Sequence, residues 1–269
     1  MTSAILKSFA LLLLAAAAGA SAAAPATVFL EDLTWTELRD EIRVGKTTII
    51  VPIGGTEQNG PHMALGKHNA RARALAERIA RDLGNALVAP VIAYVPEGNL
   101  DPPTAHMRFP GTITLPDAIF EKMLEAAARS FKHHGFRDVV FLGDHGGYQK
   151  VDQAVADRLN HEWAATPVRA HAILEYYRVT NTAYVDALKG RGYSADEIGT
   201  HAGLADTSLT LALAPALVRA DRLAGTAKPA ASDGVYGDPR RSSAEVGQLG
   251  VDAIVTTTVA AIRKATARR

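Results

Sequence analysis

The sequence predicts an α/β protein in which helices cover both faces of a mainly parallel sheet. Short apolar runs alternate with longer amphipathic ones along the chain. Alternation of strands with helices is typical of a parallel sheet, and strands buried on both faces are apolar throughout. The composition agrees, because 48% hydrophobic and 21% charged residues are the balance of an ordinary globular domain.

The predicted elements follow one another in a regular order. The predicted strands are short apolar runs, namely Thr48–Ile53, Ala86–Ala93, Asp138–Leu142 and Val168–Leu174. The segments between and after them carry apolar residues at helical spacing. The predicted helices are Ala70–Leu83, Pro116–His134, Lys150–Ala165, Ser208–Arg219 and Val251–Ala267.

The N-terminal segment has the pattern of a secretory signal peptide. Lys7 precedes an apolar stretch, and the small residues Ala20-Ser21-Ala22 follow it. A cationic start, an apolar run and an A-x-A-like site are the parts of such a signal. A buried or membrane-anchoring helix is the alternative, but the run is short for crossing a bilayer. We therefore expect a signal peptide at residues 1–22, a single domain at residues 23–269, and a periplasmic or secreted location.

Charge and cysteine content exclude several kinds of partner and ligand. Loss of the signal removes Lys7 from the 29 basic residues and none of the 28 acidic ones, so the mature chain carries no net charge. Nothing in this balance favours a nucleic acid or an anionic membrane as a partner. With no cysteine in the sequence, disulfides and thiolate ligands are excluded. Any metal has to be held by His, Asp, Glu or Asn.

Most of the unusual polar residues lie in loops beside predicted strands and helices. Glu57 lies in the glycine-rich stretch after the first strand, and His145 follows the third. His106 lies in a long connection rich in Pro and Gly, and Asp206 lies just before a predicted helix. Ligands of open α/β sheets bind beyond the carboxyl ends of the strands. We therefore expect these loops to meet in one site.

Each candidate also fits an ordinary structural role. His145 fits a helix cap and Glu57 a partly exposed loop carboxylate. His68 fits a solvated turn residue and Asp206 an N-cap. Burial of Glu57, however, is costly unless the carboxylate is paired or binds a metal. Four residues of metal-binding type at the ends of elements together favour a metal site, and histidine with carboxylate suits Zn²⁺ or Mn²⁺.

Five motifs resemble those of the creatininase, or creatinine amidohydrolase, family. The family patterns are similar to "PxGSxEQHGPHLPLGTD", "H…FPGTISL", "NGHGGN", "HAGxxETS" and "GDPxxAtaekG". The counterparts here are "PIGGTEQNGPHMALGKH", "HMRFPGTITL", "GDHGGYQ", "HAGLADTS" and "GDPRRSSAEVG". They occur in the family's order, from about residue 33 to about residue 262. One such motif is a weak signal, but five in order identify the chain as a member of the family.

The resemblance implies a fold, an activity and roles for particular residues. It implies a three-layer α/β/α sandwich, commonly assembled as a hexamer, with a two-metal centre that hydrolyses a C–N bond, often in a cyclic amide. Position by position, it implies that Glu57 and His145 are metal ligands and that His201 faces the substrate. Asp206 stands where many members have a glutamate.

Two departures from the family pattern fall in the implied metal centre. Asn59 stands where the family has a second-metal histidine, and His68 replaces a bridging aspartate. A carboxylate can bridge two cations, whereas an imidazole normally offers one nitrogen to one metal. We therefore expect one tight ion, Zn²⁺ or Mn²⁺, held by Glu57, His68 and His145. Asp206 either completes the set of ligands or holds a water.

The remaining candidates are for proton transfer, a second ion or substrate contact. His201 or Asp206 is the expected general base or acid. Asp144 and Tyr148 depart from the family's central motif, which has Gly and Asn there. The candidates for a second ion or for substrate contact are Asn59, His62, His106, Asp144 and Tyr148.

The expected function is that of an exported, metal-dependent amidohydrolase. It acts on a C–N bond, other than a peptide bond, of a small and preferably cyclic amide, and the family resemblance implies a homo-oligomer. The alternative is a pseudoenzyme of the same fold that binds a small ligand or a protein partner without hydrolysis. Hydrolysis is favoured, because position 68 exchanges one ligand type for another and Glu57, His145 and His201 persist.

Overall fold

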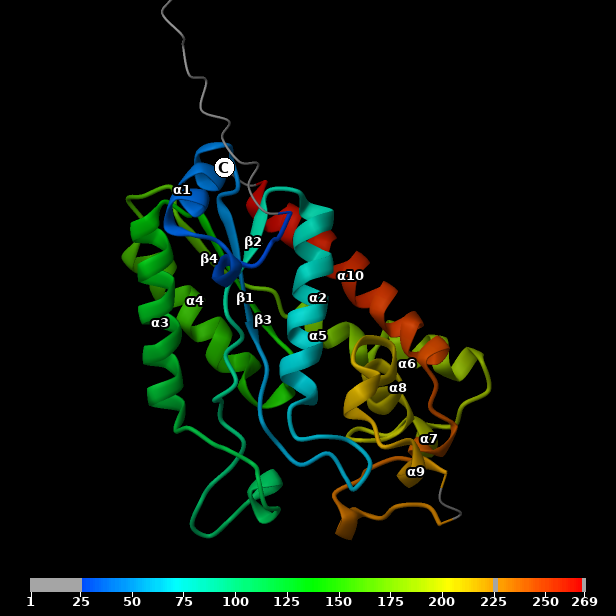
Figure 1. The fold of residues 1–269 in the computed structure, drawn as a ribbon. Helices are drawn as coiled ribbons and strands as arrows, with labels where there is room; N and C mark the ends of the chain where they lie inside the picture. Colours follow the sequence, from blue (N-terminus) through cyan, green and yellow to red (C-terminus); the bar gives the residue numbers. More distant parts are fainter. Residues whose placement is uncertain (1–25, 225–226, 268–269) are drawn as a thin grey trace, which may run out of the picture.

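The structure, a computed structural model, describes residues 26–224 and 227–267. Within these residues the strands form one parallel sheet in the order β2-β1-β3-β4 (Figure 1). The strands are β1 (Thr48–Ile53), β2 (Ala86–Val88), β3 (Asp138–Gly143) and β4 (Arg169–Ala172). The predicted parallel α/β sheet is confirmed. The predicted signal peptide, residues 1–22, lies outside the described residues.

Helices connect the strands and extend the fold beyond the sheet. The longer ones are α1 (Trp35–Arg43), α2 (Lys67–Leu83), α3 (Asp117–His134), α4 (Gln149–Glu162), α6 (Ala183–Gly190), α8 (Leu204–Leu213) and α10 (Ala244–Thr266). The short α-helices are α5 (Glu175–Arg178), α7 (Ala195–Ile198) and α9 (Ala220–Leu223). The 3₁₀ helices are η1 (Leu30–Asp32), η2 (Ala105–Arg108), η3 (Gly146–Tyr148), η4 (Val179–Asn181), η5 (Pro215–Leu217), η6 (Ala231–Asp233) and η7 (Pro239–Arg241).

The sheet separates two hydrophobic cores. Successive side chains of a strand point to opposite faces, so Ile49 and Val51 of β1 join the core formed with α3 and α4. Ile50, between them, joins the core formed with α2 and α10. In Figure 1 the sheet accordingly lies between α3 and α4 on one side and α2 and α10 on the other. The expected three-layer α/β/α sandwich is confirmed.

Helix α2 begins earlier than predicted, and this changes where a candidate ligand lies. Its first residue is Lys67 rather than Ala70, and Gly66 is the N-cap. Lys67 and His68 are both buried and lie in the first turn of the helix. His68 is therefore not a solvated turn residue.

Helix α8 lies earlier in the sequence than predicted. It spans Leu204–Leu213 rather than residues 208–219, because Pro215 favours an extended conformation before it and supplies no N–H donor. Gly203 is the N-cap, so Asp206 is inside the first turn and is not the capping residue.

Strand β2 is shorter than predicted. It ends at Val88 rather than Ala93, because Pro90 has no N–H to donate to a neighbouring strand. The chain then runs on as an irregular segment that pairs briefly with β1 through Ile92. This segment leads towards Glu97, which is buried.

Helix α10 packs in the core of the domain, although its composition would also suit a membrane-crossing helix. It is long and apolar enough to cross a membrane. Yet Val251, Ile254 and Ile262 pack into the core beside β1 and α2. The helix therefore supplies packing surface to the domain.

Helices α8 and α10 approach closely at Gly247, which gives a test of this packing. A Cβ at Gly247 would lie 1.8 Å from the carbonyl oxygen of Ser208, a backbone atom. We expect Gly247→Ala to lower the free energy of unfolding by about 1–3 kcal/mol or more, as overpacking does. Gly190→Ala in α6 is the control, because a Cβ there meets no atom within 4 Å. Urea denaturation of both variants makes the comparison, and equal losses would contradict the packing described here.

Candidate active site

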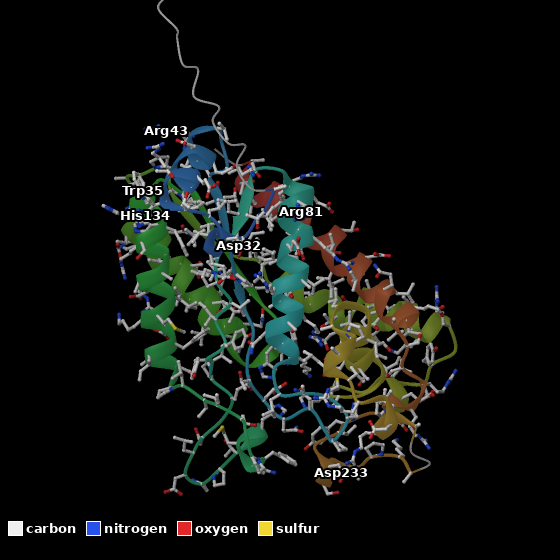
Figure 2. All side chains as sticks on the ribbon, in the orientation of Figure 1. Asp32, Trp35, Arg43, Arg81, His134 and Asp233 are labelled. Carbon is white, nitrogen blue, oxygen red and sulfur yellow. The ribbon has the colours of Figure 1, made fainter. Side chains whose placement is uncertain are left out.

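Three loops at the carboxyl ends of the strands form the candidate site. Glu57 follows β1, His145 follows β3, and His106 lies in η2 on the long connection between β2 and α3. Figure 2 shows Asp233 at the end of the molecule opposite Trp35 and Arg43. Gln58 Nε2 donates to the carbonyl oxygen of Gly234, next to Asp233, at 3.1 Å. The candidate site therefore lies at the Asp233 end.

Four side chains in these loops surround a single point. Glu57, Glu97, His106 and His145 each offer one ligand atom, and these atoms lie within 4.8 Å of one another. His106 Nε2 is 3.0 Å and His145 Nε2 is 3.8 Å from Glu57 Oε2. His145 Nδ1 is 3.8 Å from Glu97 Oε2. We call these four residues the four-residue cluster.

The carboxylates of the four-residue cluster are suited to a cation. Both oxygens of Glu97 and the Oε2 atom of Glu57 are buried, with no hydrogen-bond partner among the described residues. Burial and the neighbouring Glu57 carboxylate raise the pKa of Glu97 to about 9. A buried charged group needs a partner or a metal, and a divalent ion would satisfy all three oxygens. The donor set of carboxylates and imidazoles therefore fits Zn²⁺ or Mn²⁺.

The histidines of the cluster are in the form that binds metal. Burial lowers the pKa of His145 to about 4, and burial also lowers the pKa of His106. Both imidazoles are therefore neutral at neutral pH, and a neutral imidazole has a free nitrogen lone pair for a metal ion.

A glycine lets Glu97 reach the cluster. Gly55 has a φ of +151°, in the region that favours glycine, and a Cβ there would lie 2.6 Å from Glu97 Oε1. Any side chain at position 55 would therefore displace the Glu97 carboxylate.

His68 lies beside the cluster, between two carboxylates. Its Nε2 is 2.8 Å from Glu57 Oε1 and its Nδ1 is 2.5 Å from Asp144 Oδ2. Burial and Lys67 oppose protonation of His68, but Glu57 and Asp144 outweigh them and raise its pKa. Both ring nitrogens are thus engaged, and His68 is not part of the four-residue cluster. Its role as a ligand stays a prediction.

Asp206 is likewise engaged in ion pairs. Its carboxylate accepts from Lys67 Nζ and from Arg71 Nη1, and the Ala202 N–H donates to it at 2.9 Å. Burial opposes its ionisation, but Lys67 and Arg71 hold its pKa well below the ordinary value. Asp206 therefore lies outside the four-residue cluster, and its roles as ligand and base stay predictions.

Buried charges around the cluster are balanced. Arg71 Nη2 donates to Asp144 Oδ2 at 2.8 Å, and the Tyr176 hydroxyl donates to Asp144 Oδ1 at 2.8 Å. Burial opposes ionisation of Asp144, but Arg71 and His68 outweigh burial and lower the pKa of this carboxyl group. Three cations thus meet three carboxylates, and we call the six residues the buried ion network: Lys67, His68 and Arg71 with Glu57, Asp144 and Asp206.

His201 connects the cluster to a cavity. Its Nε2 lies 3.0 Å from the Gln58 carbonyl oxygen, and its Nδ1 lies 3.7 Å from Glu57 Oε1. Burial and the Lys67 ammonium lower its pKa to about 3, so the ring is neutral at neutral pH.

The cavity beside the cluster has a volume of about 140 Å³. Its walls are formed by residues of the four-residue cluster, of the buried ion network and of the connections before and after α6. Among them are Lys67, His106, His145, Tyr177, Asn181 and His201. A space of this size with polar walls accommodates a molecule of a few heavy atoms.

The other candidates from the sequence hold the surrounding loops. Asn59 Nδ2 donates to the carbonyl oxygens of Glu57 and Ala64, at 2.9 and 3.0 Å. The Tyr148 hydroxyl donates to the Gly54 carbonyl oxygen at 2.6 Å and accepts from the His145 N–H at 3.1 Å. These two side chains therefore fix the backbone on either side of the cluster.

His62 contacts helix α8 rather than the cavity. Its Nε2 is 3.0 Å from Thr207 Oγ1 in α8, and burial lowers its pKa to about 4. It is not among the residues that line the cavity.

The residues predicted from the sequence did not include Glu97, Lys67 or Arg71. Glu97 lies between Pro96 and Gly98 after an apolar run, which is the pattern that pointed to Glu57. Arg71 lies one turn before Leu75 on the buried face of α2, and a charged residue on an apolar face signals a buried partner.

Comparison with known proteins identifies relatives of the chain. A family model described as creatinine amidohydrolase matches residues 31–262. The creatinine amidohydrolase of Pseudomonas putida is 29% identical over 205 residues, which are 73% of this chain and 76% of that protein. The mycofactocin precursor peptide peptidase of Mycolicibacterium smegmatis is 32% identical over 222 residues, which are 79% of this chain and 76% of that protein.

Solved structures agree with the sequence comparisons. A crystal structure of creatinine amidohydrolase matches with a TM-score of 0.75 at 25% identity, covering 91% of this chain and 100% of that one. Two further creatininases cover 89% of this chain and 98% of their own. One, described as of Zn-Zn type, has a TM-score of 0.72 at 26% identity, and the other, described as Mn, has 0.71 at 25%.

Proposed function

Because the chain belongs to the creatininase family, whose relatives here are hydrolases, we propose that it is an exported, metal-dependent amidohydrolase. Its substrate is a small, preferably cyclic, amide that is cleaved at a C–N bond. The observation that carries the proposal is the four-residue cluster, in which buried carboxylate oxygens without hydrogen-bond partners face two neutral imidazoles beside a cavity.

Glu57, Glu97, His106 and His145 would hold one ion, Zn²⁺ or Mn²⁺. This set keeps Glu57 and His145 from the expected ligands and adds His106 and Glu97. When bound, such an ion polarises a carbonyl group and lowers the pKa of a bound water. All four side chains come from this chain, and their ligand atoms lie within 4.8 Å of one another.

The chain's own residues orient the substrate and move the proton. His201 borders the cavity with Nε2 held by the Gln58 carbonyl oxygen, which leaves Nδ1 to take up a proton. With a pKa of about 3 the ring is a weak base, so it would hold a proton only briefly before passing it to the leaving nitrogen. The cavity of about 140 Å³ has room for a compact ring.

The experiment is metal analysis of the mature protein combined with hydrolysis assays. Protein purified from the native host is dialysed against a mild chelator, and bound metal is measured per chain. The same protein is assayed with creatinine, hydantoin and small lactams, and with a short linear peptide because one relative is a peptidase. We expect about one ion per chain and metal-dependent cleavage of a cyclic amide.

Other outcomes identify other functions. Metal-dependent cleavage of the peptide alone would retain the hydrolase and exclude the cyclic substrate. Protein without metal and without activity would support the pseudoenzyme. The observation in favour of that alternative is the buried ion network, whose charges are balanced without a metal ion. The intact mass of the same preparation tests export, since a full-length mass would contradict removal of residues 1–22. Light scattering tests the proposed homo-oligomer.

A further inference from the structure

The two oxygens of the Glu57 carboxylate face different surroundings. Oε2 points to the four-residue cluster, with His106 Nε2 at 3.0 Å. Oε1 points to the buried ion network, with His68 Nε2 at 2.8 Å and Lys67 Nζ at 3.6 Å. A carboxylate can bind a separate cation with each oxygen. On the Oε1 side, that cation is already part of the protein.

Lys67 is held in place by burial and by its position on α2. Its side chain is 1% exposed, and a lysine is almost never so buried unless it is paired. The ammonium donates to Asp206 and faces Glu57 Oε1. His201 Nδ1 lies 3.7 Å from the same Glu57 oxygen. The ammonium thus lies between two carboxylates, and an imidazole approaches one of these carboxylates as well. Carboxylate and imidazole groups are also ligands of divalent ions.

Lys67 also lines the cavity, together with His201 and His145. An ammonium has three donors, and in the described part of the chain Asp206 and Glu57 are the carboxylates within 4.0 Å of it. A donor therefore remains for an oxygen atom in the cavity.

We propose that Lys67 is the second cation of this centre. This inference rests on the proposed function. The fixed ammonium occupies the place of a second metal ion beside Glu57 Oε1, limits the centre to one ion, and donates a hydrogen bond to the carbonyl oxygen of the substrate. It stabilises the negative charge that develops on that oxygen when the C–N bond is attacked, as donors held in an oxyanion hole do.

The test is metal stoichiometry of Lys67 variants with Mn²⁺ as the probe. Lys67→Ala removes the ammonium and opens the space between Glu57 Oε1, Asp206 and His201. After equilibration with MnCl₂ and dialysis, we expect about one ion per wild-type chain and about two per Lys67→Ala chain. Two ions that share Glu57 should also give a spin-coupled electron paramagnetic resonance signal. The wild-type protein should lack it.

Lys67→Arg is the matched control, because it keeps the positive charge. It should stay at one ion per chain. Circular dichroism checks the fold of each variant, and Lys67→Gln replaces Lys67→Ala for the same measurement if the alanine variant does not fold. The Lys67 inference is overturned if the uncharged variants keep one ion, if Lys67→Arg gains a second, or if the wild-type protein binds two. A wild-type protein that binds none would instead contradict the proposed function.

Discussion

Replacing Glu97 by glutamine should remove the metal ion and with it nearly all hydrolysis. The amide has almost the same shape as the carboxyl group but lacks the negative charge and is a poorer ligand. Since a catalytic ion contributes several kcal/mol to the stabilisation of a transition state, we expect kcat/KM to fall on the order of 10³-fold. Metal analysis after dialysis and assays on a substrate of the parent protein measure both losses.

The same substitution should not destabilise the metal-free protein. Burial and the neighbouring Glu57 carboxylate raise the pKa of Glu97 to about 9, so at neutral pH this group has to take up a proton when the empty protein folds, a cost that glutamine avoids. A binding residue that is unfavourable for stability is typical of a functional site. Thermal denaturation without metal should give an unchanged or higher midpoint.

A second buried glutamate provides the control. Glu125 of α3 is buried but pairs with Lys122 and Arg129, away from the cluster. Glu125→Gln should leave metal content and activity unchanged. If Glu97→Gln keeps its ion after dialysis, the four-residue cluster is not the metal site.

Replacing Arg71 by methionine should destabilise the fold strongly. Arg71 is 4% exposed and donates to Asp144 through Nε and Nη2 and to Asp206 through Nη1. Methionine fills much of the space but leaves the buried Asp144 and the partly buried Asp206 short of a partner. Removal of one member of a buried ion pair costs about 3–5 kcal/mol, and we expect a loss of that size in urea denaturation.

Arg81 lies on the same helix and gives the comparison (Figure 2). Its side chain is 51% exposed and pairs with Glu77. Exposed pairs of this kind contribute about 0.3–0.5 kcal/mol, so Arg81→Met should be nearly neutral. Similar small losses for both variants would show that Asp144 and Asp206 do not depend on Arg71.

The parts of the fold that local pattern determines were predictable. Thr48–Ile53 is a strand with the predicted bounds, because five of its six residues are apolar and glycines follow. Glu57 and His145 follow β1 and β3 directly, so the rule that sites lie beyond the carboxyl ends of strands placed them together. The five sequence motifs identified the family, and the comparison with the family model confirms it.

The parts that depend on distant partners were not predictable. Lys67 and Asp206 are 139 positions apart in the sequence, and no local pattern indicates that they meet. His68 is metal-binding in type, but its two carboxylate neighbours come from the loops after β1 and β3. Glu97 follows a strand that Pro90 shortens, so its place at the cluster depends on the path of an irregular segment.

The balance of charge in the buried ion network has a consequence for the order in which the protein matures. In a site built only of like-charged ligands, the ligands repel one another until an ion binds. Folding then depends on the metal. Here the cations that offset Glu57, Asp144 and Asp206 belong to the chain, and Glu97 can stay uncharged. The polypeptide can therefore fold empty and load afterwards. With the export that we propose, the ion could then be taken up outside the cell that makes the protein.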